Sequence, residues 1–211
     1  MSNKTATANS NDLVKLYQVI DEDGVITTKY KYLTGSPKNY RFDGRTGDFN
    51  LDGKMPLGKK LTIQPISFRF MEDSLFARKS DSTGETKREL WCEVYFIDEK
   101  KSVSYIMFNN SSARALQRII ETLYYEDLQL NELVLTITSE KKENAKGKYF
   151  VATFDYVPAT LESISEYKQL CTDLPIYSKD TIQESADNIL FFGLYPSHLL
   201  QSSPIQPLIE A

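Results

Sequence analysis

The sequence has little of what most enzymes use at their active sites. It contains a single histidine, His198, near the C-terminus, and no neighbouring pattern suggests a His-based triad or a histidine-rich metal site. No glycine-rich loop of the P-loop or dinucleotide-binding type occurs either. We therefore expect a binding protein rather than an enzyme, and we expect no cofactor.

Long apolar runs and paired cysteines are also missing. No run approaches the roughly 20 apolar residues that span a bilayer, so no membrane association is expected. Cys92 and Cys171 are the only cysteines and cannot make a disulfide framework, which favours a reducing cytoplasm. Residues 1–12 are small and polar, lack the apolar stretch of a secretory signal, and are predicted to be a disordered leader.

The net charge of −4 is distributed unevenly along the chain. Residues 1–53 carry a net charge of 0, residues 54–148 carry +2 and residues 149–211 carry −6. A mildly basic middle followed by an acidic end suits a nucleic-acid binder. An unevenly charged but merely solvated surface explains the same distribution, because +2 is far below a clear basic patch.

Aromatic residues are plentiful, with 13 Tyr and 11 Phe, and they favour strands and contact surfaces. In the central zone, residues 57–157, alternating patterns predict a succession of strands at 61–70, 90–97, 102–108, 133–138 and 148–157. Pro65 marks an edge position or a bulge in the first of them. A helix capped by Ser111 or Ser112 is predicted to end near Asp127. Polar loops are expected at 77–88, within the first hairpin, and at 139–147, between the last two strands.

Two extensions flank this zone. The N-terminal one, residues 13–56, is predicted to form a hairpin followed by a loop over residues 34–56. In the C-terminal one, residues 158–195, Thr160 caps a first helix and a second helix runs from about 178 to 190. Residues 196–211 contain two prolines and are predicted to be a flexible tail.

The element order of residues 57–157 resembles that of an OB-fold single-stranded DNA-binding protein, of the divergent kind encoded by phages. The resemblance implies a mainly β fold, a five-stranded Greek-key barrel with one helix between strands three and four, plus the N-terminal hairpin and C-terminal helices. It also implies that the two long loops and the face of strands two and three bind the ligand. The expected function is binding of single-stranded DNA with little sequence preference in replication or recombination, with RNA left open as a ligand.

A nonspecific single-strand binder needs aromatic faces for stacking and cations along the phosphates. Trp91 and Tyr95 share one face of their predicted strand, and Tyr105 lies on the next strand, so these three are the stacking candidates. The alternative for each ring is the barrel core. The cation candidates are Arg69, Arg78, Lys79, Lys87, Arg88, Lys141, Lys142, Lys146 and Lys148, for each of which surface solvation is the plainer explanation.

Other interpretations stay open. A non-enzymatic adaptor or phage structural component would use an aromatic-rich β surface and the apolar run 189–192 as an interface. Its partners would be proteins, whereas the nucleic-acid interpretation adds replication or recombination proteins, and either is compatible with a homo-oligomer. A third option is a carboxylate-dependent nuclease.

The segment from Asp48 through Asn50 and Asp52 to Gly53 matches the first half of a calcium loop. Lys59 stands where the loop needs its bidentate Glu, so an Asx-rich turn is the simpler interpretation.

Overall fold

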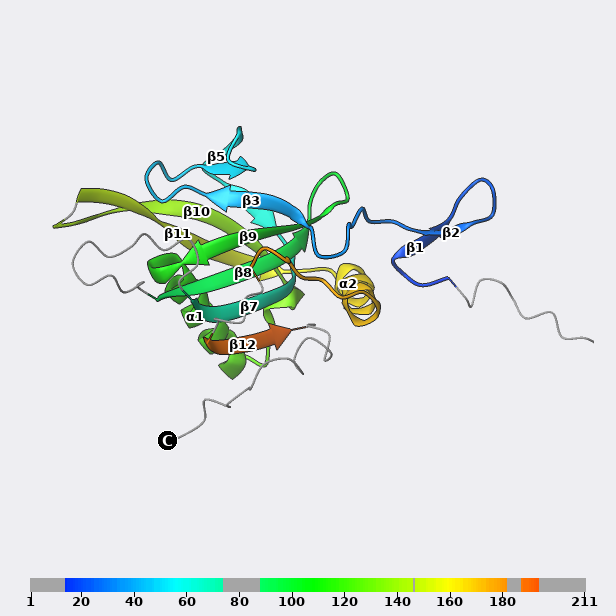
Figure 1. Cartoon of the computed structure of the whole chain (residues 1–211). Coiled ribbons are helices and arrows are strands. Elements are labelled where there is room, and N and C mark those ends of the chain that lie inside the picture. The colour runs from blue at the N-terminus through cyan, green and yellow to red at the C-terminus, as the bar shows by residue number, and fades with distance from the viewer. Residues whose placement is uncertain (1–13, 74–87, 146, 182–186, 194–211) are drawn as a thin grey trace, which may run out of the picture.

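The chain is mainly β: a seven-stranded sheet, a three-stranded sheet and a two-stranded hairpin are accompanied by two α-helices (Figure 1). The computed structural model describes residues 14–73, 88–145, 147–181 and 187–193, the last range by its backbone alone. Within these ranges neither helix is long and apolar enough to cross a bilayer.

The larger sheet consists of β3 (Lys38–Phe42), β4 (Phe49–Leu51), β5 (Met55–Gly58), β7 (Pro65–Asp73), β8 (Glu89–Ile97), β9 (Val103–Asn109) and β12 (Asp187–Gly193). Its strand order is β12-β7-β8-β9-β3-β4-β5, and β3 with β9 is the parallel pair in it. The expected hairpin of the second and third strands is confirmed, because β8 pairs with β9 from Trp91 opposite Asn109 to Ile97 opposite Val103.

The smaller sheet consists of β6 (Leu61–Ile63), β10 (Leu133–Asn144) and β11 (Gly147–Pro158), in the order β11-β10-β6. β6 leads into β7 through Gln64, so one stretch of chain contributes to both sheets. The register of β7 against β8 shifts between Pro65 and Ser67, which confirms the bulge predicted at Pro65. This bend lets the two sheets face each other.

The sheets do not close into a barrel. β9 pairs with β3, and no ladder joins it to β11 in the described chain. The seam between them is occupied by α1 (Asn110–Tyr125) and by the turn at 43–47. Ala152 donates its backbone N–H to Ser112 Oγ at 3.0 Å, and Phe150 donates its N–H to the Gly44 carbonyl at 2.7 Å. These contacts satisfy edge groups of β11 that a neighbouring strand would otherwise use.

The two helix caps turn out differently. α1 follows Asn109, whose side chain makes no capping hydrogen bond, so the predicted cap by Ser111 or Ser112 is wrong. Ser112 is instead drawn to β11 by the contact with Ala152. α2 (Leu161–Asp173) begins as predicted, with Thr160 Oγ1 accepting a hydrogen bond from the Ser163 N–H.

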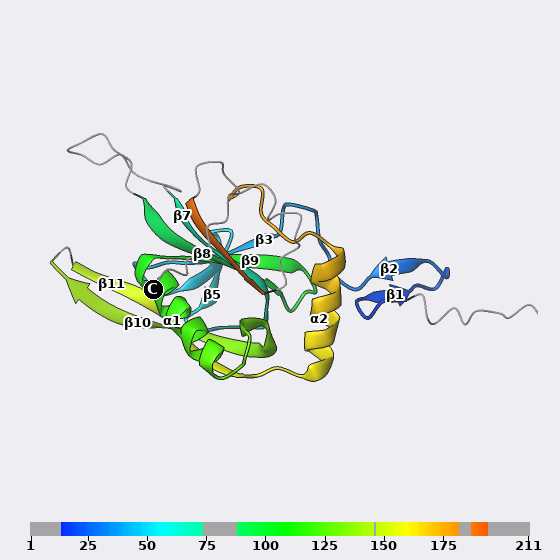
Figure 2. The same ribbon diagram turned by 90° about the horizontal axis from the view of Figure 1, so that it is seen from below.

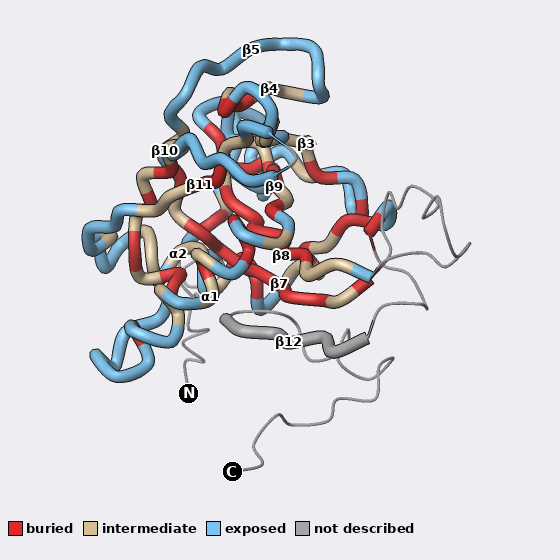
Figure 3. The backbone as a smooth tube through the Cα atoms, turned by 90° about the vertical axis from the view of Figure 1, so that its left-hand side faces the viewer, coloured by how far each residue is buried: buried red, intermediate tan, exposed pale blue. Residues whose placement is uncertain are grey.

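The main core lies between the two sheets and α1. β8 turns Cys92, Val94 and Phe96 inward, as its alternation predicts, and the strands around it add Phe68, Phe70, Ile106, Phe108, Leu135 and Ile137. In Figure 3, β7 and β8 run mostly as buried backbone, whereas the segment around β5 is exposed.

The opposite face of β7, β8 and β9 is also covered. Tyr95, Tyr105 and Ile66 pack there against Leu170, Cys171 and Ile176, which come from α2 and the segment after it. Burial raises the pKa of the Cys171 thiol to about 12, so this thiol is protonated and inert at neutral pH. Strands β7, β8 and β9 therefore form a buried middle layer. The alternation of residues along a strand does not show that both of its faces are covered.

Two sequence predictions for the flanking zones are wrong. The segment 34–56 is not the expected loop, since β3, β4 and the start of β5 form in it, with glycines at 44, 47 and 53 in the turns between these short strands. The helix predicted at 178–190 is wrong at both described ends. Residues 179–181 form a turn, and Asp187–Gly193 is the strand β12, paired with β7. The apolar run 189–192 thus belongs to a sheet edge.

The N-terminal hairpin is confirmed as β1 (Gln18–Ile20) and β2 (Ile26–Thr28), paired in register. It extends away from the sheets on the side of α2, and the hairpin of β10 and β11 extends on the opposite side (Figures 1 and 2). The molecule thus has one β-projection at each end.

Candidate nucleic-acid interface

The three aromatic rings predicted to stack on bases are core side chains in this structure. Tyr95 is 0% exposed, Tyr105 4% and Trp91 9%. Tyr95 and Tyr105 stack on each other, with ring centroids 5.8 Å apart, and Trp91 Nε1 donates a hydrogen bond to the Asp73 carbonyl at 3.2 Å. None of them offers a free face to a base, so the expected stacking platform is corrected: the alternative of core packing describes these rings.

Arg69, expected on the phosphates, is buried in an ion pair. Its Nε and Nη2 lie 2.8 and 2.7 Å from Glu93 Oε2, and the Tyr95 hydroxyl donates to the same oxygen at 3.0 Å. Nη2 also donates to the Thr181 carbonyl at 3.0 Å. A guanidinium neutralised in this way holds the segment after α2 onto the sheet and is not available to a phosphate.

The loop expected at 139–147 is in fact strand. β10 and β11 pair without interruption from Leu133 opposite Pro158 to Asn144 opposite Gly147. We call the distal part of this hairpin, residues 139–152, the ribbon. Lys141, Lys142 and Lys148 are exposed on it, while Lys146 lies outside the described residues. Regular pairing fixes which lysines share a face, and a loop would not have done so.

The other cation candidates belong to the loop predicted at 77–88. Arg78, Lys79 and Lys87 lie outside the described residues. Arg88 is exposed where β8 begins, and its Nη2 donates to the Glu72 carbonyl at 2.7 Å. The structure therefore keeps Arg88 on the surface, beside β7.

One face of the ribbon gathers cations around an aromatic ring. Lys141 is directly opposite Phe150 and Lys148 is directly opposite Glu143, so these four side chains point to the same face. Lys59, from the turn between β5 and β6, places Nζ 5.4 Å from the centroid of the Phe150 ring. We call Lys59, Lys141, Lys148 and Phe150 the ribbon site.

The opposite face of the ribbon is nearly neutral. There Lys142 Nζ lies 2.8 Å from Glu140 Oε2 on the same strand. On the ribbon site's own face, three lysines stand against Glu143 alone, and no ion pair joins Lys59, Lys141 or Lys148 to another described residue. The cations of this face are thus the ones left for an anionic ligand.

The turn at 43–47 supports the ring. Gly47 has a φ of +76°, and a Cβ there would lie 2.6 Å from the Phe150 ring. Ser139 Oγ donates to the Gly47 carbonyl at 3.1 Å, which ties the same turn to β10. Glycine at 47 lets the turn pack against one side of Phe150, leaving the ring half-buried beneath Lys59.

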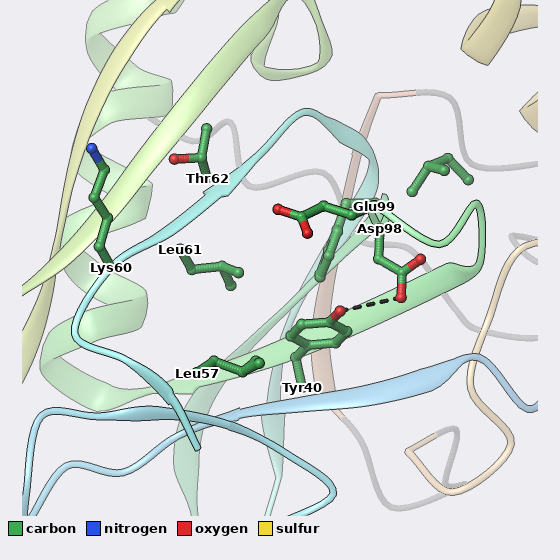
Figure 4. A pocket seen from close by; sticks show the side chains of 9 residues that line it. Tyr40, Leu57, Lys60, Leu61, Thr62, Asp98 and Glu99 are labelled. Carbon is green, nitrogen blue, oxygen red and sulfur yellow. Dashed lines mark hydrogen bonds between the residues drawn. The ribbon is translucent and has the colours of Figure 1, made fainter. Parts of the chain in front are cut away.

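A pocket of about 590 Å³ opens beside this site, between β5, β6 and the end of β8 (Figure 4). Its lining includes Tyr40, Leu57, Lys60, Leu61, Thr62, Phe96, Ile97, Asp98 and Glu99. Lys60 is the neighbour of Lys59, so the pocket and the ribbon site meet along the turn between β5 and β6. The pocket thus lies between an edge strand of each sheet, β5 of the larger and β6 of the smaller.

Asp98 organises the wall of that pocket. Its Oδ2 accepts hydrogen bonds from Lys38 Nζ and from the Tyr40 hydroxyl, and its Oδ1 accepts from the Lys100 and Ser102 N–H groups at 2.9 Å. Burial opposes ionisation, but these donors outweigh it and lower the pKa of Asp98. The carboxylate is thus saturated with donors and serves structure rather than ligand binding.

The calcium-like segment does not form a cation cage. Asn50 lies on β4, and Asp52 lies in the turn after it, with a φ of +52°. Among the described residues no three or more His, Cys, Asp or Glu side chains gather where they could hold a metal ion. His198 lies outside the described residues.

Sequence reasoning missed Lys59 and Phe150. The signal for them was present as the Lys59–Lys60 dipeptide and as an aromatic pair, Tyr149 and Phe150, directly after Lys148. Only the pairing of β10 with β11 and the turn before β6 show that these segments meet.

Comparison with known proteins adds no relative: no family model, no curated protein and no solved structure matches this chain.

Proposed function

We propose that this protein binds single-stranded nucleic acid, with little sequence preference, along the ribbon and the turn beside it. The observation that carries the proposal is the ribbon site, where Lys59, Lys141 and Lys148 surround the half-buried ring of Phe150. Cations that follow a phosphate backbone beside an aromatic face are the combination that sequence-independent single-strand binding requires. Single-stranded DNA is the ligand we put first.

The fold gives independent support. β7, β8 and β9 form a meander, α1 follows, and β10 and β11 come next, with β6 and β7 serving as one bent strand between the sheets. We infer a divergent, open relative of the five-stranded OB barrel in which β3 has taken the place beside β9. In OB-type barrels the loop between the last two strands contributes to the ligand site, and here that connection is the ribbon.

The role we infer is non-enzymatic, in organising or protecting exposed strands during replication or recombination. The ribbon site has lysines and an aromatic ring but no base and nucleophile set, which suits binding rather than bond cleavage. Lysines contact phosphates, which DNA and RNA share, so single-stranded RNA would bind at the same lysines.

The test is binding of a fluorescently labelled poly-pyrimidine DNA strand, followed by anisotropy at several salt concentrations. Trp91 is buried and would not report binding directly, so the label belongs on the DNA. The variant Lys59→Ala/Lys141→Ala/Lys148→Ala should bind at least about tenfold more weakly. The slope of log K against log salt should become shallower by about 0.7 for each phosphate that the variant no longer neutralises.

A matched control removes three other exposed lysines: Lys168 on α2, Lys31, which is bridged to Ser102, and Lys100 in the turn just before Ser102. This triple variant should bind like the unchanged protein. Equal weakening in both variants would show that net charge, and not the ribbon, matters. Absence of single-strand binding by the unchanged protein at low salt would overturn the proposal.

A further inference from the structure

The N-terminal hairpin is a projecting arm with an anchored base and an apolar outer part. We define the arm as residues 14–33. At its base, Tyr17 and Tyr30 are buried, the Tyr30 hydroxyl donates to Glu166 Oε1, and the Leu16 N–H donates to Gln169 Oε1 at 2.6 Å. These contacts fix the direction in which the arm leaves α2.

Beyond that base the arm exposes apolar side chains that cover nothing in the described chain. Val25 is 56% exposed, Ile20 49%, Ile26 45% and Val19 42%. A two-stranded hairpin is at best marginally stable by itself in water. Ile20 is directly opposite Ile26, so these two side chains form an exposed apolar patch on one face of the hairpin, whereas Val19 and Val25 point to the other face.

The tip of the arm is strongly acidic. Asp21, Glu22 and Asp23 are consecutive, and residues 18–27 contain no basic residue. Asp21 Oδ1 is used inside the turn, where it accepts from the Asp23 and Val25 N–H groups at 3.1 and 2.8 Å. Glu22 and Asp23 remain as exposed carboxylates beside the apolar surface.

The complementary surface is on the same chain, at the edge of the larger sheet. We call residues 53–60, which include β5, the arch. The arch carries Lys54, Lys59 and Lys60 without any acidic residue, and it exposes Met55 to 53% as well as Leu57. The arch is therefore basic where the tip of the arm is acidic, and it exposes apolar side chains on an edge strand.

The arm cannot reach the arch of its own chain. The arm leaves the body at the α2 end, whereas β5 lies over β3 on another side of the molecule (Figures 1 and 2). A contact between them must join two copies, and because the two surfaces differ, the contact is head-to-tail and can repeat.

We propose that the arm docks on the arch of a second copy of this chain, with Ile20 and Ile26 against Met55 and Leu57. Glu22 and Asp23 lie opposite Lys54 and Lys60 in this contact. The contact builds chains of copies and does not depend on nucleic acid, so it stands or falls separately from the proposed function.

The test is self-association of the full chain by sedimentation velocity, over a range of concentrations at low salt. The unchanged protein should associate in a concentration-dependent way that weakens with salt. The arm variant Glu22→Lys/Asp23→Lys and the arch variant Lys54→Glu/Lys60→Glu should each associate at least about tenfold more weakly, because like charges then face each other.

Mixing the two variants supplies the decisive measurement. In the mixture, each altered arm meets an altered arch of opposite charge, and each unaltered arm meets an unaltered arch. Association should therefore return on mixing, which a folding defect in either variant would not allow.

The matched control Glu121→Lys/Glu126→Lys makes the same charge change on exposed residues of α1 and its C-terminal cap, and should associate normally. A protein that stays monomeric at every concentration would overturn the proposal. So would arm and arch variants that associate like the unchanged protein, or a mixture that fails to recover.

Discussion

The two β-projections of this molecule are built in opposite ways. The ribbon continues strands whose inner ends are in the core, where Leu135 and Ile137 are fully buried, and its outer end is polar and cationic. The arm is attached by tyrosines at its base, and its outer part is apolar with an acidic tip. A projection whose strands begin in the core can present charged side chains to a ligand, whereas exposed apolar side chains on a projection indicate contact with a protein surface.

The largest expected effect is a difference in the free energy of unfolding between two alanine substitutions, one in each projection. Ile137→Ala removes a fully buried side chain at the root of the ribbon and should lower the free energy of unfolding by about 2–5 kcal/mol. Val19→Ala, on the exposed part of the arm, should change it by less than about 0.5 kcal/mol. Urea unfolding of both variants measures the difference.

Two outcomes of this measurement would contradict the contrast between the ribbon and the arm. A large decrease for Val19→Ala would mean that the arm is packed in solution and not projecting. A small decrease for Ile137→Ala would mean that the ribbon is not rooted in the core.

A smaller effect is expected at the anchor of the arm. Tyr30→Phe removes the hydroxyl that donates to Glu166 and leaves the ring in place, which should cost about 0.5–1.5 kcal/mol because Glu166 Oε1 loses one donor and keeps Lys29 as the other. The change should be seen first as faster amide hydrogen exchange in residues 15–31. Tyr156→Phe, which makes the same change on an exposed tyrosine of β11, serves as the control. Unchanged exchange in the arm of the Tyr30 variant would show that the hydroxyl does not fix it.

The smallest effect concerns two carboxylates, one in the body and one under the arm. Burial opposes ionisation of Asp98, yet the hydrogen bonds from Lys38, Ser102 and Tyr40 lower its pKa, and the hydrogen bond from Lys15 lowers the pKa of Asp173. A depressed pKa in the folded state contributes stability that is complete above the unfolded pKa, near 4, and disappears as the pH falls through the folded value.

Stability should therefore fall with decreasing pH below about 4, and Asp98→Asn should flatten that fall more than Asp173→Asn. The difference arises because the Asp98 side chain is only 3% exposed, whereas solvent screens the pair of Lys15 and Asp173. Thermal unfolding of both variants between pH 3 and 7 provides the measurement. An equal or larger flattening for Asp173→Asn would reverse the assignment.

Much of the local structure followed from the sequence. Alternation predicted β8 and β9, the turn at 21–24 predicted the N-terminal hairpin, and Thr160 predicted the start of α2. Each of these depends on residues close together in the chain. The errors at 34–56 and 139–147 have a different origin, since strands there depend on partners far away in sequence.

The candidate site shows the same division. The sequence pointed to lysines after the fourth predicted strand, and Lys141 and Lys148 are on the exposed ribbon. It also pointed to Trp91, Tyr95 and Tyr105, and these are buried. An aromatic residue on an alternating strand shows which face it shares with its neighbours, but not what covers that face.

The sequence by itself determined a mainly β chain, the main hairpins, the cap of α2, the bend at Pro65, and the placement of charge along the chain. Only the tertiary structure decided that α2 and the segment after it cover the outer face of β8 and β9, that β3 takes the edge beside β9, and that Lys59 meets Phe150. Local patterns record the period and polarity of an element, whereas burial and neighbours depend on which distant segments pack against it.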